Sequence, residues 1–363
     1  PIIQAPMAGV QDSALALAVT RAGALGSLPA AMLSLATLRE ELTRLAVSGE
    51  GPFNINFFCH RQEAPDPAVQ ARWLQRLAPY YDEYGVHDTA GTAAPSRAPF
   101  NAEHAAMVAE FKPAVVSFHF GLPEPELLTR VKASGAKVFA SATTVAEARW
   151  LADHGADAII AQGLEAGGHR GHFLEDDLSL QQGTFSLLPL IVEAVRLPVI
   201  AAGGIVDGRG IRAALALGAS AVQMGTAFAV TRESDADAEF KSVLANAKPE
   251  DIVEFVSVAG LPARAVRTPW LDKYLRIEPK LQAVAHEKRC NMAFDCLAHC
   301  GLRDGKSDMG QFCIDKQLGH AVKGEVQKGL FFRGAGRLPF GNQIRSVQEL
   351  MEWMLAGKRP VGV

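Results

Sequence analysis

Short apolar runs alternate with helical patterns along the first two-thirds of the chain, and this alternation constrains the fold more than any other feature. The runs are nearly continuous in apolar character, as expected for strands that are covered on both faces. Eight such runs occupy residues 2–7, 24–28, 53–58, 114–120, 137–143, 158–163, 198–204 and 221–226. Helical spacing between them covers residues 13–21, 35–46, 67–77, 124–134, 145–154, 185–195 and 210–217.

Eight repeats of strand and helix predict a TIM (β/α)₈ barrel. The alternative is a doubly wound open sheet, and the similarity of the repeats favours closure. The chain has 363 residues, whereas such a barrel takes about 250. The remainder therefore belongs to an insertion or to a second domain.

The segment after the eighth run lacks the regular strand–helix alternation of the barrel. No barrel helix follows promptly, and helical stretches appear at 237–247 and 279–296 before a well-formed amphipathic helix at 346–355. We interpret this last helix as the eighth barrel helix, displaced by a mainly helical insertion. The predicted domains are a barrel of residues 1–230 plus 342–363 and an inserted subdomain of residues 231–341. An insertion there covers the C-terminal face of the barrel, where active sites form. Residues 84–104 are predicted to form a loop.

Composition argues against two classes of partner. The net charge of -3 leaves no basic surface for nucleic acid. The most apolar stretch, 187–206, contains Glu193 and Arg196, and charges within a membrane span are costly. We therefore expect no membrane span. Five cysteines and no visible secretory signal lead us to expect a cytoplasmic protein.

Glycine-rich turns close the last two strands of the predicted barrel. Gly203 and Gly204 end the seventh strand, and the sequence 223–226 (Gln-Met-Gly-Thr) ends the eighth. Loops at these two positions of a barrel often bind phosphate through backbone N–H groups. Tight turns without a ligand are the alternative, but their presence at both positions favours a cofactor that carries phosphate.

A polar, glycine-rich loop leaves the sixth strand over residues 162–172. His169 on this loop is a candidate general base, because imidazole titrates near neutral pH. An isolated loop histidine is more often merely solvated, and His172 is the weaker candidate of the two. The flanking glycines favour close approach of a flat ligand or of backbone.

Three other strand ends carry unusual residues: 5–9, 54–60 and 117–123. Asn54 and Asn56 point to the same face of their strand, so they either form a buried hydrogen-bond network or bind the edge of a heterocycle. His119 belongs either to the core or to a ligand pocket.

Four segments, 5–9, 56–60, 117–123 and 165–171, resemble the motifs of the nitronate monooxygenases, formerly called 2-nitropropane dioxygenases, of class I. The turns at 203–204 and 223–226 resemble the FMN-phosphate loops of that family. Related flavin barrels, including enoyl-thioester reductases and NADH:quinone reductases, share the glycine loops. The segments 56–60 and 119–123 favour the nitronate enzymes.

This resemblance implies an FMN-dependent oxidation of alkyl nitronates or nitroalkanes by O₂, giving a carbonyl compound and nitrite. It matches His169 to the catalytic base and His119 to a histidine in the substrate pocket. The predicted FMN-binding residues are Pro6, Met7, Asn56, Gln162, Gly167, Gly168, Gly203, Gly204, Gln223, Met224, Gly225 and Thr226. The alternatives are an NAD(P)H-dependent flavin reductase and a non-catalytic flavin- or phosphate-sensing protein. Monomer and homodimer both remain open.

Four cysteines, Cys290, Cys296, Cys300 and Cys313, lie near His299 in the predicted insertion. Zinc sites use closely spaced cysteine pairs, and only one pair here has that spacing. We therefore expect no metal. Cys59 stands beside His60, and we expect it to serve packing rather than nucleophilic chemistry.

Overall fold

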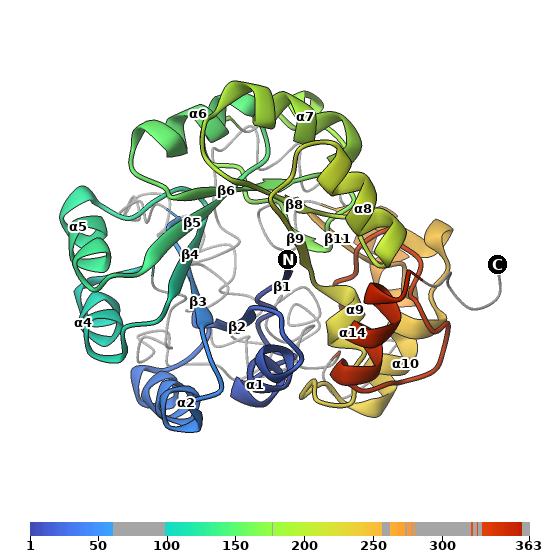
Figure 1. Cartoon of the computed structure of the whole chain (residues 1–363). Coiled ribbons are helices and arrows are strands. Elements are labelled where there is room, and N and C mark those ends of the chain that lie inside the picture. The colour runs from blue at the N-terminus through green and yellow to red at the C-terminus, as the bar shows by residue number, and fades with distance from the viewer. Residues whose placement is uncertain are drawn as a thin grey trace, which may run out of the picture.

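The computed structural model describes residues 1–60, 99–175, 177–255, 262–272, 274–276, 279, 321, 325 and 329–357. Eight parallel strands form its centre (Figure 1): β1 Ile2–Gln4, β2 Gly26–Pro29, β3 Phe53–Phe58, β4 Val115–His119, β5 Lys137–Ala142, β6 Ala158–Gln162, β8 Val199–Ala202 and β9 Ala221–Met224.

The sheet closes on itself. Its order is β1-β9-β8-β6-β5-β4-β3-β2, so β1 and β2 are the strands that must meet. They do so through a parallel bridge between Ile3 and Leu25, where the Gln4 N–H donates to the Leu25 carbonyl at 3.0 Å. The (β/α)₈ barrel is therefore confirmed, and the open sheet is excluded.

Helices surround the strands (Figure 1): α1 Ser13–Arg21, α2 Leu35–Ser48, α4 Ala102–Phe111, α5 Pro125–Ala133, α6 Val145–Asp153, α7 Thr184–Ala194, α8 Gly208–Ala216 and α14 Val347–Leu355. Most begin at a side chain that accepts a backbone N–H of the first turn, as Asp12, Ser34, Thr144 and Asp207 do. Such caps satisfy donors that have no partner inside the helix. Apolar side chains between helices and sheet make the main core.

The predicted loop at 84–104 is wrong at its C-terminal end. Helix α4 begins at Ala102, where the Asn101 side chain accepts from the N–H groups of Glu103 and His104. The apolar spacing that follows Asn101 was the available signal. The predicted helix at 67–77 lies outside the described residues.

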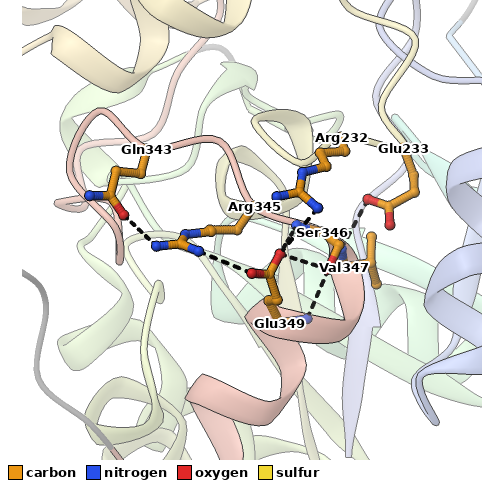
Figure 2. A network of polar contacts seen from close by, with 7 residues as sticks. All are labelled: Arg232, Glu233, Gln343, Arg345, Ser346, Val347 and Glu349. Carbon is orange, nitrogen blue, oxygen red and sulfur yellow. Dashed lines mark hydrogen bonds and ion pairs between the residues drawn. The ribbon is translucent and has the colours of Figure 1, made fainter.

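Helix α14 occupies the place of the eighth barrel helix, since it contacts both α8 and α1. Its first turn is a capping box in which Ser346 and Glu349 exchange hydrogen bonds (Figure 2). These bonds, to the Ser346 backbone first and then to its hydroxyl, lower the pKa of Glu349 to about 2, with Arg345 and Arg232 adding to the effect.

The chain leaves the barrel and returns to it at one place. The Arg232 N–H donates to the Arg345 carbonyl at 2.9 Å. Close by, Glu233 accepts from the Val347 N–H at 2.9 Å (Figure 2). A unit that is inserted into another domain must begin and end at neighbouring points on that domain. This contact supports our proposed division of the chain, with residues 231–341 as the insertion.

The described part of the insertion contains strands as well as helices. A short helix, α9 Thr226–Ala229, lies between β9 and the insertion. Within the insertion, α10 Ala238–Asn246 and the 3₁₀ turn η2 Pro249–Asp251 come first. Strands β10 Ile252–Phe255 and β11 Ala263–Val266 then pair antiparallel, and β11 also pairs with β7 Gly168–His169. The expectation of a mainly helical insertion missed these strands.

The predicted helix at 279–296 lies almost wholly outside the described residues. A 3₁₀ turn, η1 Leu178–Leu180, precedes α7. Within the described ranges, no helix combines the length and apolar character needed to cross a membrane.

Candidate active site

A cavity of about 260 Å³ opens at the C-terminal ends of the barrel strands. Residues from most strand ends line it, and the insertion contributes Phe240, Leu330 and Phe332. The lining includes all fourteen predicted site residues: Pro6, Met7, Asn56, His119, Gln162, Gly167, Gly168, His169, Gly203, Gly204, Gln223, Met224, Gly225 and Thr226.

The polar residues inside the barrel form a hydrogen-bonded floor beneath this cavity. The Asn54 amide donates to the hydroxyls of Ser27 and Ser117 at 3.0 and 2.9 Å. The Asn56 amide donates to the same Ser117 hydroxyl at 3.0 Å. Of the two asparagines, only Asn56 lines the cavity. The structure thus separates the two asparagines: Asn54 belongs to the buried hydrogen-bond network, and Asn56 belongs to that network and also lines the cavity.

The loop after β1 is held from below by two glutamines. The Gln11 side-chain oxygen accepts from the Met7 N–H at 2.9 Å and from the Gln4 amide at 2.7 Å. Gln4 and Gln11 are both buried. Pro6 and Met7 are thus presented to the cavity on a fixed loop.

The loop after β6 turns back beside its own strand, and Gln162 joins the two. Its amide nitrogen donates to the His169 carbonyl at 2.9 Å, and its amide oxygen accepts from the Gly171 N–H at 2.7 Å. The His169 ring lies 5.2 Å from the Phe332 ring, centroid to centroid. Besides lining the cavity, Gln162 therefore fixes the backbone that carries His169.

His119 is braced on two sides. Its Nδ1 lies 2.9 Å from the Ser141 hydroxyl, and it also hydrogen-bonds to the His169 backbone. Burial lowers the pKa of His119 to about 4, assisted by the charges of Arg170 and His172 and opposed by the bond to His169. His119 is therefore neutral near pH 7, and it belongs both to the barrel interior and to the cavity wall.

Gly171 is required by this arrangement. A Cβ atom there would lie 2.3 Å from the His119 ring. Gly203 and Gly204 are required by their own turn, since their φ angles are 117° and 70°. A Cβ on Gly203 would also lie 2.8 Å from the Thr184 hydroxyl. These turns leave bare backbone facing the cavity.

Several contributors to the site were not assigned a role from the sequence. Glu165 lines the cavity, and its carboxylate accepts from the N–H and hydroxyl of Thr184 at 2.8 and 2.9 Å. Arg170 is fully buried behind the loop. Both lie inside the glycine-rich loop 162–172, which the sequence already marked as part of the site. No feature of the sequence pointed to Phe332, because its position in the cavity wall depends on how the insertion folds back onto the barrel.

The cysteine expectations have different outcomes. Cys59 packs against the main core, and burial raises the pKa of its thiol well above the ordinary value. A protonated thiol is a poor nucleophile. The cluster at Cys290, Cys296, Cys300 and Cys313 lies outside the described residues. Among the residues that the structure does describe, no group of His, Cys, Asp and Glu could hold a metal ion.

The comparisons with known proteins agree with this geometry. The family model for nitronate monooxygenase matches residues 1–357. The chain belongs to the nitronate monooxygenase family. The resemblance carried by the four motif segments is thereby confirmed, and the protein is an oxidoreductase.

Relatives of known sequence carry the same name. The nitronate monooxygenase of Paraburkholderia phytofirmans is 45% identical over 268 residues, which is 73% of each chain. That of Pseudomonas aeruginosa is 42% identical over 274 residues, covering 73% of this chain and 76% of that one.

Solved structures resemble the whole fold. Nitroalkane oxidase from Streptomyces ansochromogenes has a TM-score of 0.74 and 32% identity, covering 98% of this chain and 95% of that one. FabK from Thermotoga maritima has a TM-score of 0.70 and 29% identity, covering 98% and 92%.

Proposed function

We propose that the protein oxidises alkyl nitronates with O₂ at a bound FMN, giving a carbonyl compound and nitrite. The observation that carries this proposal is the convergence of all fourteen predicted site residues on one cavity. They come from strand ends spread over more than two hundred residues of sequence, and only the closed barrel brings them together.

The lining of the cavity suits FMN in its chemistry. Bare backbone at Gly203, Gly204 and Gly225 lines one part of the cavity, where N–H groups can receive a phosphate. Apolar side chains, including Met7, Ile160 and Met224, also line the cavity and suit a flat ring system. No Lys or Arg is among the described lining residues, so backbone N–H groups would hold the phosphate. When bound, FMN supplies the electron transfer between substrate and O₂.

The protein's own side chains act on the substrate. A neutral nitroalkane must lose its α-proton before oxidation, and we assign that proton to the His169 imidazole. A nitronate has already lost it. His119 remains neutral because of its lowered pKa and contacts the substrate from the barrel side. Phe240, Leu330 and Phe332 form an apolar wall that keeps water from the reacting atoms.

An oxygen-dependent nitrite assay tests the proposal. We expect nitrite from propionate 3-nitronate and from simple alkyl nitronates, with uptake of O₂ by the purified yellow protein. Denaturation should release FMN rather than FAD, because the sequence has no dinucleotide fingerprint after its first strand. Bound flavin without nitrite would refute the proposed reaction and leave a flavin reductase or a sensing protein.

An NAD(P)H-dependent flavin reductase acting on quinones or enoyl thioesters is the second candidate. It is favoured by the glycine turns at 203–204 and 223–226, which related flavin barrels share. Anaerobic addition of NADH separates the two candidates, because a reductase would bleach its flavin rapidly. We expect slow or no bleaching.

A further inference from the structure

Three consecutive backbone carbonyls at the end of β6 each accept a hydrogen bond from an arginine. The Arg170 guanidinium donates to the Gln162 carbonyl at 2.7 Å and to the Gly163 carbonyl. Arg264, on strand β11 of the insertion, donates through Nε to the Leu164 carbonyl at 2.8 Å. We call Arg170 and Arg264 the arginine clamp.

Arg170 is built into this position. Its side chain is fully buried, and its third donor, Nε, bonds to the Gln181 side chain at 2.8 Å. A buried guanidinium is costly unless its N–H groups have acceptors. Here the acceptors are carbonyl and amide oxygens, while the carboxylates of Glu254, Glu165 and Glu147 act on Arg170 at longer range. A planar fork is needed to reach these acceptors together, and lysine cannot reproduce it.

The clamp lies directly behind the candidate base. In an extended segment, successive side chains point to opposite faces. His169 lines the cavity and a side chain at Gly171 would meet His119, whereas Arg170 between them is buried away from the cavity lining. The Arg170 side chain thus ties this segment to the end of β6, seven and eight residues earlier in the chain.

The insertion completes the arrangement. Strand β11 pairs with the loop so that Ala263 opposes His169 and Arg264 opposes Gly168. The Arg170 N–H donates to the Pro262 carbonyl at 2.8 Å. Arg264 is also within 3.9 Å of the Glu254 carboxylate on the neighbouring strand β10. The segment that carries His169 is therefore held from its own strand by Arg170 and from the insertion by Arg264.

We propose that Arg170 and Arg264 are positioning residues that fix His169 for proton abstraction, so that the insertion takes part in catalysis rather than acting only as a cover. This inference rests on the proposed function, in which His169 is the base. The competing explanation is that both arginines stabilise the fold without affecting the geometry of the base.

Four variants separate these explanations: Arg170→Lys, Arg264→Met, Arg264→Lys and the control Arg267→Met. Arg264 reaches the Leu164 carbonyl with one donor, so a lysine at 264 should keep this hydrogen bond. A lysine at 170 should lose most of the three hydrogen bonds that the Arg170 guanidinium makes. Arg267 follows β11, is exposed and pairs with Asp272 outside the clamp. We expect Arg170→Lys and Arg264→Met to impair the loop, and the other two variants to behave as wild type.

The first readout is kinetic, at matched flavin occupancy. A misplaced base should lower kcat with a neutral nitroalkane by about 10²-fold, with little change in KM. Turnover of the preformed nitronate should change far less, because no proton is abstracted. A purely structural role would lower both activities together.

The second readout is hydrogen exchange of the Arg170 and Gly171 amides, which bond to Pro262 and Gln162. Loss of charged hydrogen bonds should accelerate their exchange about tenfold or more in the two impaired variants. Wild-type exchange in Arg264→Met, or equal loss of both activities, would overturn the proposal. If Arg170→Lys does not fold, the Arg264 pair still decides. Absence of nitrite from the wild-type protein would refute the proposed function. The clamp is refuted separately, if the two amides of Arg264→Met exchange as slowly as those of the wild-type protein.

Discussion

His119 and His169 are joined through the His169 backbone, yet their surroundings suit them to different work. His119 is enclosed by the barrel wall, bonded to Ser141 and neutral because of its burial. A base with a pKa of about 4 accepts a proton weakly near neutral pH. His169 stands on the loop, beside Phe332 at the cavity wall. This contrast supports His169 as the base and His119 as its neighbour in the substrate pocket.

Replacement of His169 by Asn should separate proton abstraction from oxidation. Asparagine keeps polarity and approximate size but cannot act as the base, so activity with neutral nitroalkanes should fall by about 10²–10⁴-fold. Activity with preformed nitronates should fall far less, and FMN content should stay near normal. Steady-state kinetics on both substrates at matched flavin occupancy measures this. Equal losses would make His169 a binding residue, and no loss would shift the assignment to His119.

The lowered pKa of His119 predicts a pH dependence of stability. Its ordinary value is 6.5 and its folded value about 4, so between these values the unfolded chain binds more protons than the folded one. The contribution of His119 to the free energy of unfolding is therefore fully present above about pH 6.5 and is lost as the pH falls toward 4. Between about pH 7 and pH 4.5 the loss should be about 2 kcal/mol.

Urea unfolding of wild type and His119→Gln at both pH values measures this loss. Glutamine does not titrate, so the variant should lose about 2 kcal/mol less than wild type over that interval. Comparing the two losses cancels the other titrating groups. Identical losses in both proteins would show that His119 titrates normally in the folded state.

At the scale of elements, the loop after β6 and the returning insertion pack backbone against backbone. A Cβ on Gly167 would lie 2.5 Å from the Gly334 nitrogen and 2.6 Å from the Arg333 carbonyl carbon. The Ala335 N–H donates to the Glu165 carbonyl at 2.9 Å, and the Gly334 N–H to the Thr226 hydroxyl at 3.1 Å. Three separate segments thus meet with no room for a side chain.

The substitution Gly167→Ala should therefore push the insertion away from the loop. We expect a loss of about 1–3 kcal/mol in the free energy of unfolding, because backbone atoms cannot yield as a flexible side chain would. Denaturant unfolding measures it, with Gly210→Ala as the control. Gly210 lies in helix α8, where the nearest contact to an added Cβ is 3.4 Å, so this change should be neutral or stabilising. An unchanged stability in Gly167→Ala would mean that the segments separate easily.

The elements that sequence analysis missed have physical reasons in common. Strand β7 has two residues and forms because β11 pairs with it, and no local pattern of two residues identifies a strand. Helix α4 begins within a segment whose preceding residues are rich in Gly, Ala, Pro and Thr, and that composition outweighed the cap at Asn101. By contrast, β3 and α1 have the predicted bounds, because their apolar periodicity is clear.

At the scale of the whole molecule, the insertion joins the barrel at its ends, at β11 and at the loop after β6. Arg232, at its start, bonds to Arg345 in the segment that returns to the barrel, and α14 then completes the ring of helices. These connections are made by backbone hydrogen bonds and apolar packing. The described part of the insertion therefore has a means of attachment that uses no metal.

We accordingly predict that removal of divalent metal leaves the fold intact. The spacing of Cys290, Cys296, Cys300 and Cys313 is poor for a zinc site. Thermal unfolding before and after treatment with a chelator should give the same midpoint, and elemental analysis should show less than stoichiometric zinc. Stoichiometric zinc together with unfolding on chelation would overturn the prediction.

The sequence by itself predicted the barrel and the segments that line its cavity. A strand that is covered on both faces can be recognised from its continuous apolar residues alone. The glycine turns and the loop histidine can likewise be recognised from the local sequence, whatever the rest of the chain does. The tertiary structure alone decided which of these residues meet. It assigned Asn54 to the floor and Asn56 to the cavity, set the burial that lowers the pKa of His119, and brought Arg264 to a carbonyl one hundred residues away in sequence. Such outcomes depend on contacts between distant segments, whose energies no local pattern records.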